Sequence, residues 1–365
     1  MITDQISSGG TSIWLDDLSR SKITGLDPHS LPHRIARDGV VGVTTNPSIF
    51  CAAISKGSEY AGDISKLRGS SPDVVIQKLT TDDVRNACDL FVQIHEKTHG
   101  VDGRVSIEVD PRSARNTQAT ITEGIALWKI VDRPNVLIKV PATVEGLPAI
   151  TQLIAEGISV NVTLIFSVAR YLQVMDAFMK GLEFRVASGF PISDIASVAS
   201  FFISRIDSAV DAQLKKLNTS KAQELLGKTA IANAALAYQA FLKVQETPRW
   251  KNLSASGARM QRPLWASTGV KDPSYLDTRY VLELIDAHCV NTMPQSTLDA
   301  VLDHGVFLNT PLSATFTHAE QTISALDGLG ISLDAITDFL ETDGVAKFAD
   351  SWLELIASVE KALNA

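Results

Sequence analysis

The stretch VLIKVPAT, residues 136–143, places a lysine in the middle of a short apolar, β-branched run. A run of this length, with turn-forming residues before it and Glu145 and Gly146 after it, is typical of a strand buried on both faces. Burial disfavours the charged form of a lysine, and a neutral amine at Lys139 could attack a carbonyl carbon. The run is equally compatible with an ion-paired core lysine, or with a lysine at a strand end whose amine reaches solvent.

Length and composition bound the class of protein. The chain has 365 residues, 45% hydrophobic and 20% charged, which suits a soluble globular protein with a sizeable core. Its net charge of −8 argues against a nucleic-acid partner. The polar N-terminus lacks the pattern of a signal peptide, and no apolar run approaches the ~20 residues of a membrane helix. Three widely spaced cysteines without a Cys-x-x-Cys favour a reduced, cytoplasmic compartment.

Short strand-like runs alternate with helical segments along most of the chain. We expect strands within the segments 12–18, 40–46, 104–110, 136–143, 159–166, 198–202, 262–268 and 288–294. Alternating strands and helices predict a parallel sheet, and eight such units that close on themselves form a (β/α)8 TIM barrel, usually ~250 residues long. An open doubly wound sheet fits less well, because no Gly-x-Gly-x-x-Gly follows the first strand.

The segments between the strands are predicted to be mostly helical. We expect helices at 31–37, 73–99, 116–130, 145–156, 167–182, 204–217, 221–245 and 275–286, and a loop over 55–72. After Pro294 the chain reads as helix apart from loops near 303–312 and 328–332. With no long linker, residues 1–365 are predicted to form a single domain, with strands over about 12–294 and additional C-terminal helices over about 295–365.

Polar residues within the predicted strands recur at a spacing of two, which places each pair on one strand face. The pairs are Thr44 and Asn46, Ser106 and Glu108, and Asn161 and Thr163, while Asp16 and Lys139 stand singly near strand ends. In a barrel, active-site groups gather where the C-terminal ends of the strands meet. Turn formation before Pro47 explains Asn46 about as well as a role in the site does. It does not explain Glu108 or Thr163, so the pattern predicts a Schiff-base site in which the lysine attacks a ketone.

Two segments carry a family resemblance. GVTTNPSIF, 42–50, and VLIKVPATVEGLPA, 136–149, resemble the two signature segments of the transaldolases, and LDD, SIEVD, NVTLIFS and SFFISR agree in order along the chain. The resemblance implies transfer of a dihydroxyacetone unit from a ketose phosphate, such as sedoheptulose 7-phosphate or fructose 6-phosphate, to an aldose phosphate, glyceraldehyde 3-phosphate or erythrose 4-phosphate. It places the chain in the non-oxidative pentose phosphate pathway and implies neither a metal nor an organic cofactor. We expect sugar phosphates as ligands, no nucleic acid or membrane, and a monomer or homodimer.

The resemblance also implies a role for each matched residue. Lys139 matches the Schiff-base lysine, and Asp16 matches the acid/base aspartate near the C4 hydroxyl of the donor. Glu108 and Thr163 match the groups that hold the catalytic water, with Glu108 handling its proton. The matched binding residues are Asn46 and Asn161 for donor hydroxyls, Ser106 as a polar wall, Phe202 beside the water, and Ser200 and Arg205 for phosphate. Lys271, after the seventh strand, is either a second phosphate contact or an exposed surface lysine.

The sequence also contains one possible metal-binding motif and is compatible with two alternative functions. HEKTH, 95–99, matches the His-Glu-x-x-His zinc-protease pattern. Its helix ends just before the third strand, so we expect it at the end of the barrel opposite the active site, without a metal. The alternative functions are a Schiff-base sugar-phosphate aldolase (a lyase) on the same barrel and a non-catalytic sugar-phosphate-binding barrel. A transferase needs an aldose phosphate to turn over, whereas a lyase releases free dihydroxyacetone.

Overall fold

Eight parallel strands form a closed barrel in the computed structural model, which describes residues 1–56 and 58–364. They follow one another around the barrel in chain order, and the first pairs with the last. The strands are β1 (Thr11–Leu15), β2 (Val40–Val43), β3 (Arg104–Glu108), β4 (Val136–Pro141), β5 (Val160–Ile165), β6 (Ser197–Phe202), β7 (Arg262–Ala266) and β8 (Cys289–Met293). The predicted (β/α)8 TIM barrel with additional C-terminal helices is confirmed, and each strand lies in its predicted segment or begins one residue earlier.

The strands read as apolar runs because both of their faces are covered. Every residue of β3 to β8 is buried, since side chains fill the barrel on the inside and helices cover it on the outside. Packing between β1 and β2 is especially close. A Cβ on Gly42 would lie 2.5 Å from the indole of Trp14, so glycine at this position makes room for the ring.

Helices surround the barrel and continue past its last strand. The α-helices are α1 (Ile2–Ser8), α2 (Arg20–Thr24), α3 (Leu31–Arg37), α4 (Pro47–Lys56), α5 (Ala61–Lys66), α6 (Pro72–Lys97), α7 (Thr117–Val131), α8 (Gly146–Ala155), α9 (Val168–Ala187), α10 (Ser204–Leu217), α11 (Ser220–Leu225), α12 (Thr229–Gln245), α13 (Pro248–Ala255), α14 (Arg279–Leu282), α15 (Gln295–His304), α16 (Phe316–Asp327) and α17 (Leu333–Leu363). Short 3-10 turns lie at η1 (Ser58–Tyr60), η2 (Pro111–Ser113) and η3 (Leu312–Thr315). No helix in the described part of the chain is both long and apolar enough to cross a membrane.

The helix predicted over 275–286 is wrong in length, because α14 has only four residues. The carbonyl of Tyr280 accepts a hydrogen bond from Asn291 Nδ2 at 2.9 Å, and that of Leu284 accepts one from Trp265 Nε1 at 3.0 Å. Barrel side chains therefore satisfy carbonyl groups that a longer helix would have used for its own backbone.

The helix predicted over 221–245 is divided into α11 and α12 at Gly227, whose φ of +68° is left-handed. The N–H of Gly227 donates to Asp211 Oδ1 at 3.0 Å, and its carbonyl accepts from Arg279 Nη2 at 2.6 Å. These contacts with α10 and α14 fix the turn, so the break depends on tertiary structure rather than on local pattern alone.

The loop predicted over 55–72 contains more helix than expected, in η1 and α5; residue 57 lies outside the described residues. Tyr60 is fully buried, and its hydroxyl donates to Asp83 Oδ2 of α6 at 2.6 Å. A buried aromatic with a satisfied hydroxyl holds the surrounding backbone in one conformation.

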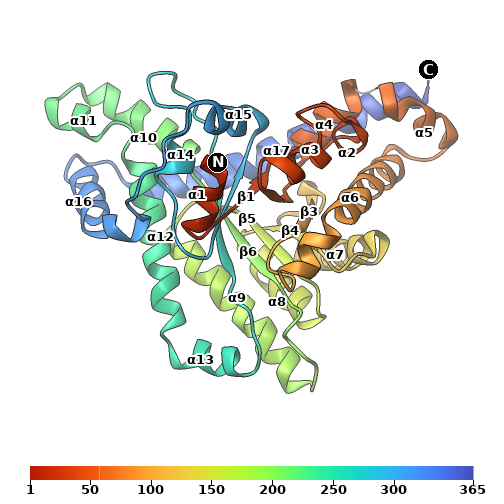
Figure 1. The fold of residues 1–365 in the computed structure, drawn as a ribbon, viewed down its shortest axis with the longest axis horizontal. Coiled ribbons are helices and arrows are strands. Elements are labelled where there is room, and N and C mark those ends of the chain that lie inside the picture. Colours follow the sequence, from red (N-terminus) through yellow and green to blue (C-terminus); the bar gives the residue numbers. More distant parts are fainter. Residues whose placement is uncertain (57, 365) are drawn as a thin grey trace.

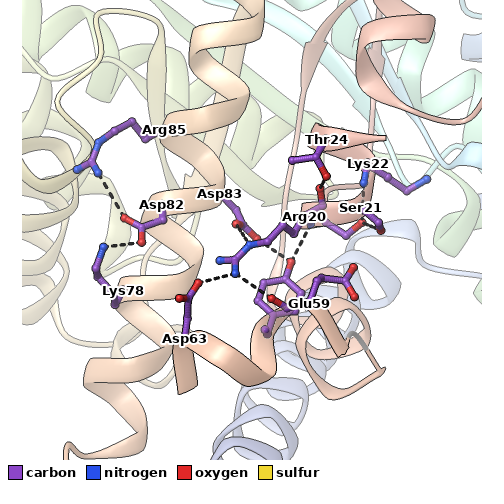
Figure 2. Close-up of polar contacts among 12 residues, drawn as sticks. Arg20, Ser21, Lys22, Thr24, Glu59, Asp63, Lys78, Asp82, Asp83 and Arg85 are labelled. Carbon is purple, nitrogen blue, oxygen red and sulfur yellow. Dashed lines mark hydrogen bonds and ion pairs between the residues drawn. The ribbon is translucent and has the colours of Figure 1, made fainter. Parts of the chain in front are cut away.

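Arg20 joins this segment to the barrel. Its guanidinium lies 3.2 Å from Asp83 and 2.7 Å from Asp63 of α5, as Figure 2 shows. Because α2 follows β1 directly, the cluster of Arg20, Tyr60, Asp63 and Asp83 ties the loop that carries Asp16 to α5 and α6.

The C-terminal helix α17 covers the end of the barrel where the strands finish. Figure 1 shows it passing across the molecule from near α16 to a C-terminus beside α5. Ser351 hydrogen-bonds Ser48 of α4 at 2.7 Å, and Phe348 is only 4% exposed. A Cβ on Gly344 would lie 3.0 Å from Leu164 of β5, which shows how closely this helix approaches the strands.

Candidate active site

The amine of Lys139 is buried in the C-terminal half of β4. Its Nζ lies 3.1 Å from Oε2 of Glu108 and donates to the carbonyl of Thr45 at 3.0 Å. The ring of Phe348 stands 5.6 Å away, and Lys139 is 4% exposed. The amine therefore does not extend into open solvent, and its neighbours are one carboxylate, one carbonyl and one aromatic face.

A cavity of about 190 Å³ opens beside Lys139 at this end of the barrel. Seven of the predicted site residues line it: Asp16, Asn46, Lys139, Ser200, Phe202, Arg205 and Lys271. They come from β4 and β6 and from the segments after β1, β2, β6 and β7, so the C-terminal ends of the strands do meet at one site. The other four, Ser106, Glu108, Asn161 and Thr163, are buried in β3 and β5.

Asp16 is held in place by a hydroxyl pair at the cavity wall. Thr44 Oγ1 donates to Asp16 Oδ1 at 2.6 Å and lies 2.7 Å from Thr292 Oγ1. Burial raises the pKa of Asp16, although the charge of Lys139 and the Thr44 hydrogen bond oppose this. The carboxyl can therefore hold a proton closer to neutral pH than an exposed aspartate can.

Glu108 forms the other acidic side of the site. Burial raises its pKa to about 7 against the opposing charge of Lys139. Its Oε1 and the Oγ1 of Thr163 are buried, and neither makes a hydrogen bond to another described residue. Leu164, directly after Thr163, has a φ of +60°, and strained residues of this kind concentrate at functional sites. Both oxygens can therefore hydrogen-bond a water or a substrate.

Asn161 lies below the cavity and joins three strands. Its Nδ2 donates to Ser106 Oγ at 3.0 Å, and its Oδ1 accepts from Ser200 Oγ at 2.7 Å. Asn161 and Ser106 are fully buried and do not line the cavity, whereas Ser200 does. In this structure the amide positions Ser200.

Asn46 both caps the start of α4 and lines the cavity. Its Oδ1 accepts from the N–H of Ile49 at 3.0 Å, in the first turn of α4. The interpretation of Asn46 as a turn residue is therefore correct, and the side chain also lines the cavity beside Lys139.

Two cations line the same cavity. Burial lowers the pKa of Arg205, its Nη1 has no hydrogen-bond partner among the described residues, and its guanidinium stands 5.5 Å from the ring of Phe202. Lys271 is exposed and also lines the cavity, so the two interpretations of this residue are compatible. An arginine with an N–H group that the described residues leave free, in the same cavity as a lysine, is suited to a phosphate group.

Sequence reasoning missed several side chains that shape the site. Thr44 appeared only as the neighbour of Asn46, but it hydrogen-bonds Asp16; its spacing within the strand was the available signal. Phe348 and Ser48 line the cavity from α17 and α4. No local pattern marks Phe348, because its position depends on where α17 crosses the barrel.

The HEKTH segment lies at the opposite end of the barrel, as predicted. His95 is in the last turn of α6, and His99 follows that helix just before β3. No group of three metal-binding side chains occurs among residues 1–56 and 58–364. Gly100, directly after the segment, lines a different cavity, considered below.

Comparisons with known proteins agree with this geometry. Residues 13–359 match the family model described as Transaldolase/Fructose-6-phosphate aldolase. A curated relative from Mycolicibacterium smegmatis, named transaldolase, is 53% identical over 362 residues, covering 99% of this chain and 97% of its own length. Transaldolases from Renibacterium salmoninarum and Thermobifida fusca are 52% and 51% identical, each over 99% of this chain and over 96% and 98% of their own lengths. The chain therefore belongs to the transaldolase/fructose-6-phosphate aldolase family of enzymes.

Proposed function

We propose that this chain is a transaldolase that works through a Schiff base on Lys139. It transfers a dihydroxyacetone unit from sedoheptulose 7-phosphate or fructose 6-phosphate to glyceraldehyde 3-phosphate or erythrose 4-phosphate. The observation that carries the proposal is the buried amine of Lys139, 3.1 Å from Glu108, in a cavity that also holds Arg205 and Lys271. The curated names of relatives at 51–53% identity support it. The proposal includes a cytoplasmic monomer or homodimer in the pentose phosphate pathway.

The cavity can orient a ketose phosphate because such a substrate carries its ketone and its phosphate far apart. Arg205 and Lys271 would bind the phosphate, and the ketone would then lie toward Lys139. Asn46 and Ser200, which also line the cavity, offer hydrogen bonds to donor hydroxyls.

The proton-transfer groups surround Lys139. The Glu108 carboxylate takes a proton from the paired Lys139 ammonium, and the neutral amine then attacks the ketone carbon. Through a water held with Thr163, Glu108 returns that proton to the hydroxyl, which leaves as water and gives an iminium. Asp16 then accepts the proton of the C4 hydroxyl as the C3–C4 bond breaks. The electron pair of that bond moves to the iminium and gives an enamine, and the aldose phosphate leaves. The enamine attacks the acceptor aldehyde, Asp16 returns the proton, and hydrolysis frees the new ketose.

Borohydride trapping tests the Schiff base directly. Reduction in the presence of fructose 6-phosphate should leave one three-carbon adduct per chain, on the peptide that contains Lys139. The variant Lys139→Ala should fold, because an apolar side chain suits β4, and should remain unlabelled. Labelling at Lys271, or no labelling of the wild-type protein, would contradict the proposal.

A further inference from the structure

A second, larger cavity lies at the opposite end of the barrel, where the strands begin. Its volume is about 620 Å³, and it shares no lining residue with the cavity at Lys139. Residues at the start of β3 and β7 line it, together with Trp250 of α13 and the turn at Gly100. Figure 1 shows α13 at the lower end of the molecule, away from α10, α14 and α15. The volume is within the ~300–1,000 Å³ of small-molecule sites.

The charge of this cavity is positive in a chain whose net charge is −8. Arg104, Arg259 and Arg262 line it against a single carboxylate, Asp102, so three positive charges less one negative charge leave +2. Asp102 is already engaged, since it lies 3.0 Å from Arg262 and accepts from Ser12 Oγ at 2.8 Å. The positive charges of Arg104 and Arg259 have no carboxylate partner among the described residues.

Arg104 is the clearest sign of a missing anionic partner. It is 2% exposed, and its guanidinium donates only to carbonyl groups: to Gly100 at 2.6 and 2.9 Å and to Pro134 at 3.4 Å. A buried charge usually has an ionic partner, because carbonyl dipoles do not cancel its charge. Burial and the charge of Arg259 together lower the pKa of Arg104 to about 10.

Nitrogen atoms from three separate elements converge at Gly100. A Cβ on this glycine would lie 2.8 Å from Arg259 Nη1, 3.1 Å from Arg104 Nη2 and 3.2 Å from His95 Nε2. The Nε2 of His95 is buried and has no hydrogen-bond partner among the described residues. Burial and these two arginines lower the pKa of His95 to about 4, which reflects the same positive surroundings.

We propose that this cavity is a binding site for a small phosphorylated metabolite, with its phosphate held by Arg259 and Arg104 at Gly100, next to the ring of His95. Arginine presents paired N–H donors that match phosphate oxygens, and the guanidinium of Arg259 bonds only the His99 carbonyl among the described residues. Trp250 and Met260 provide an apolar wall for the rest of the ligand. The bound phosphate would neutralise the charge that Arg104 leaves uncompensated.

Calorimetry with inorganic phosphate, on full-length protein, tests this site. The background variant Arg205→Ala weakens phosphate binding at the other cavity, and one phosphate per chain should still bind at the cationic cavity. Adding Arg259→Ala should weaken that binding roughly 10- to 100-fold, as expected for a charge-assisted contact. Arg259→Lys should recover part of the affinity because it keeps the charge. Lys251→Ala, which removes an exposed cation from the neighbouring helix α13, should leave binding unchanged.

A second measurement follows the wild-type protein directly, with one substitution used only to assign the signal. Phosphate should raise the pKa of His95, followed by NMR of its ring and assigned with His95→Gln. Because the site is remote from Lys139, Arg259→Ala should also keep full activity, which separates this proposal from the proposed function. The phosphate-site proposal would be overturned if the Arg205→Ala protein bound no phosphate, or if adding Arg259→Ala left its phosphate affinity unchanged.

Discussion

At the scale of single residues, the proposed chemistry rests on the buried pair of Lys139 and Glu108. Both side chains are almost completely buried, and burial raises the pKa of Glu108 to about 7. A carboxyl with this pKa can give a proton to a leaving hydroxyl and take one back near neutral pH. Buried ion pairs contribute little net stability, because desolvation offsets their attraction. The pair is therefore better explained by proton transfer than by a structural role.

The variant Glu108→Gln should keep the fold and lose most of the activity. Glutamine preserves the shape but cannot exchange a proton, so kcat/KM for fructose 6-phosphate should fall roughly 10²–10⁴-fold. In the wild-type enzyme the carboxylate forms as the pH rises through about 7, so kcat/KM should rise over that range. That rise should be absent from the pH profile of the variant, and its thermal unfolding should be unchanged.

Glu123 provides the matched control. Burial raises its pKa to about 7 as well, and it lines a separate cavity of about 110 Å³ that Glu108 also reaches. If Glu108 is the titrating group, Glu123→Gln keeps the rise in kcat/KM. If kcat/KM no longer rises with pH in Glu123→Gln but still rises in Glu108→Gln, the titrating carboxyl is Glu123 and not Glu108.

Arg205→Ala should weaken recognition of the substrate's phosphate group and leave the chemical steps at Lys139 unchanged. Loss of a charge-assisted contact costs about 1.5–3 kcal/mol, so kcat/KM for fructose 6-phosphate should fall about 10- to 100-fold. The value for fructose, which lacks the phosphate, should change little. Kinetics with both sugars measure the ratio, and Arg259→Ala, at the opposite end of the barrel, should preserve it. An unchanged ratio in Arg205→Ala would exclude this arginine as the phosphate contact.

At the scale of elements, the strands were predictable and several helices were not. Strands such as β4 and β5 are short, β-branched and buried on both faces, so their local pattern identifies them. The ends of α14 and α11 depend on side chains of distant strands and helices, which no local pattern contains. The short helix α13 did have a signal, since Thr247 caps it and Pro248 occupies its first turn.

The same distinction applies to the candidate site. Residues within strands, such as Lys139 and Glu108, or directly after one, such as Asp16, were predictable because a barrel brings strand ends together. Phe348 reaches Lys139 from a helix at the far end of the chain, and only the packing of α17 places it there. The cationic cavity at the other end also depends on tertiary structure, because Arg104 and Arg259 are far apart in sequence.

The cluster in Figure 2 predicts a stability effect at this scale. Asp83 is fully buried, so Arg20→Ala would leave its carboxylate without a charged partner and should cost roughly 3 kcal/mol. Burial raises the pKa of Asp83, opposed by Tyr60 and Arg20. A carboxyl whose pKa is raised by folding favours the folded state below its unfolded pKa and loses that contribution as the pH rises through its folded pKa.

Removing Arg20 raises that folded pKa further, so the loss of stability should be larger at pH 8 than at pH 5. Urea unfolding at both pH values measures it. Lys78→Ala is the control, because Lys78 pairs with the partly exposed Asp82 on the same helix and should change stability by less than about 0.5 kcal/mol. Equal effects of the two substitutions would show that the Arg20 cluster does not hold α2 to α6.

At the scale of the whole molecule, the two ends of the barrel differ in how they are closed. The end that holds Lys139 lies under α17. An ion pair at 3.2 Å joins Glu341 of α17 to Arg170 of α9. The other end contains the larger cationic cavity, next to α13. In TIM barrels the C-terminal end of the strands carries catalysis, so a cover at that end controls which molecules reach the reacting atoms.

Phe348→Ala should therefore change the fate of the bound dihydroxyacetone unit. In a transferase the enamine on Lys139 must persist until the acceptor arrives. Water that reaches it first protonates the enamine and hydrolyses the iminium, which releases free dihydroxyacetone. Phe348 is 4% exposed and its ring stands 5.6 Å from Lys139 Nζ, so removing the ring opens a path for water. The ratio of dihydroxyacetone released to dihydroxyacetone transferred should rise, while borohydride trapping at Lys139 continues.

Phe339→Ala is the matched control, because Phe339 lies on the same helix and is 63% exposed. Its ratio of release to transfer should equal that of the wild-type protein. Truncating a buried phenylalanine costs about 3–5 kcal/mol, so both variants are compared well below their unfolding temperatures. If Phe348→Ala lowers the rate but leaves the ratio unchanged, the ring positions the donor and does not exclude water. If the wild-type protein itself releases dihydroxyacetone as fast without an acceptor as with one, the barrel is a lyase, and α17 has no intermediate to protect.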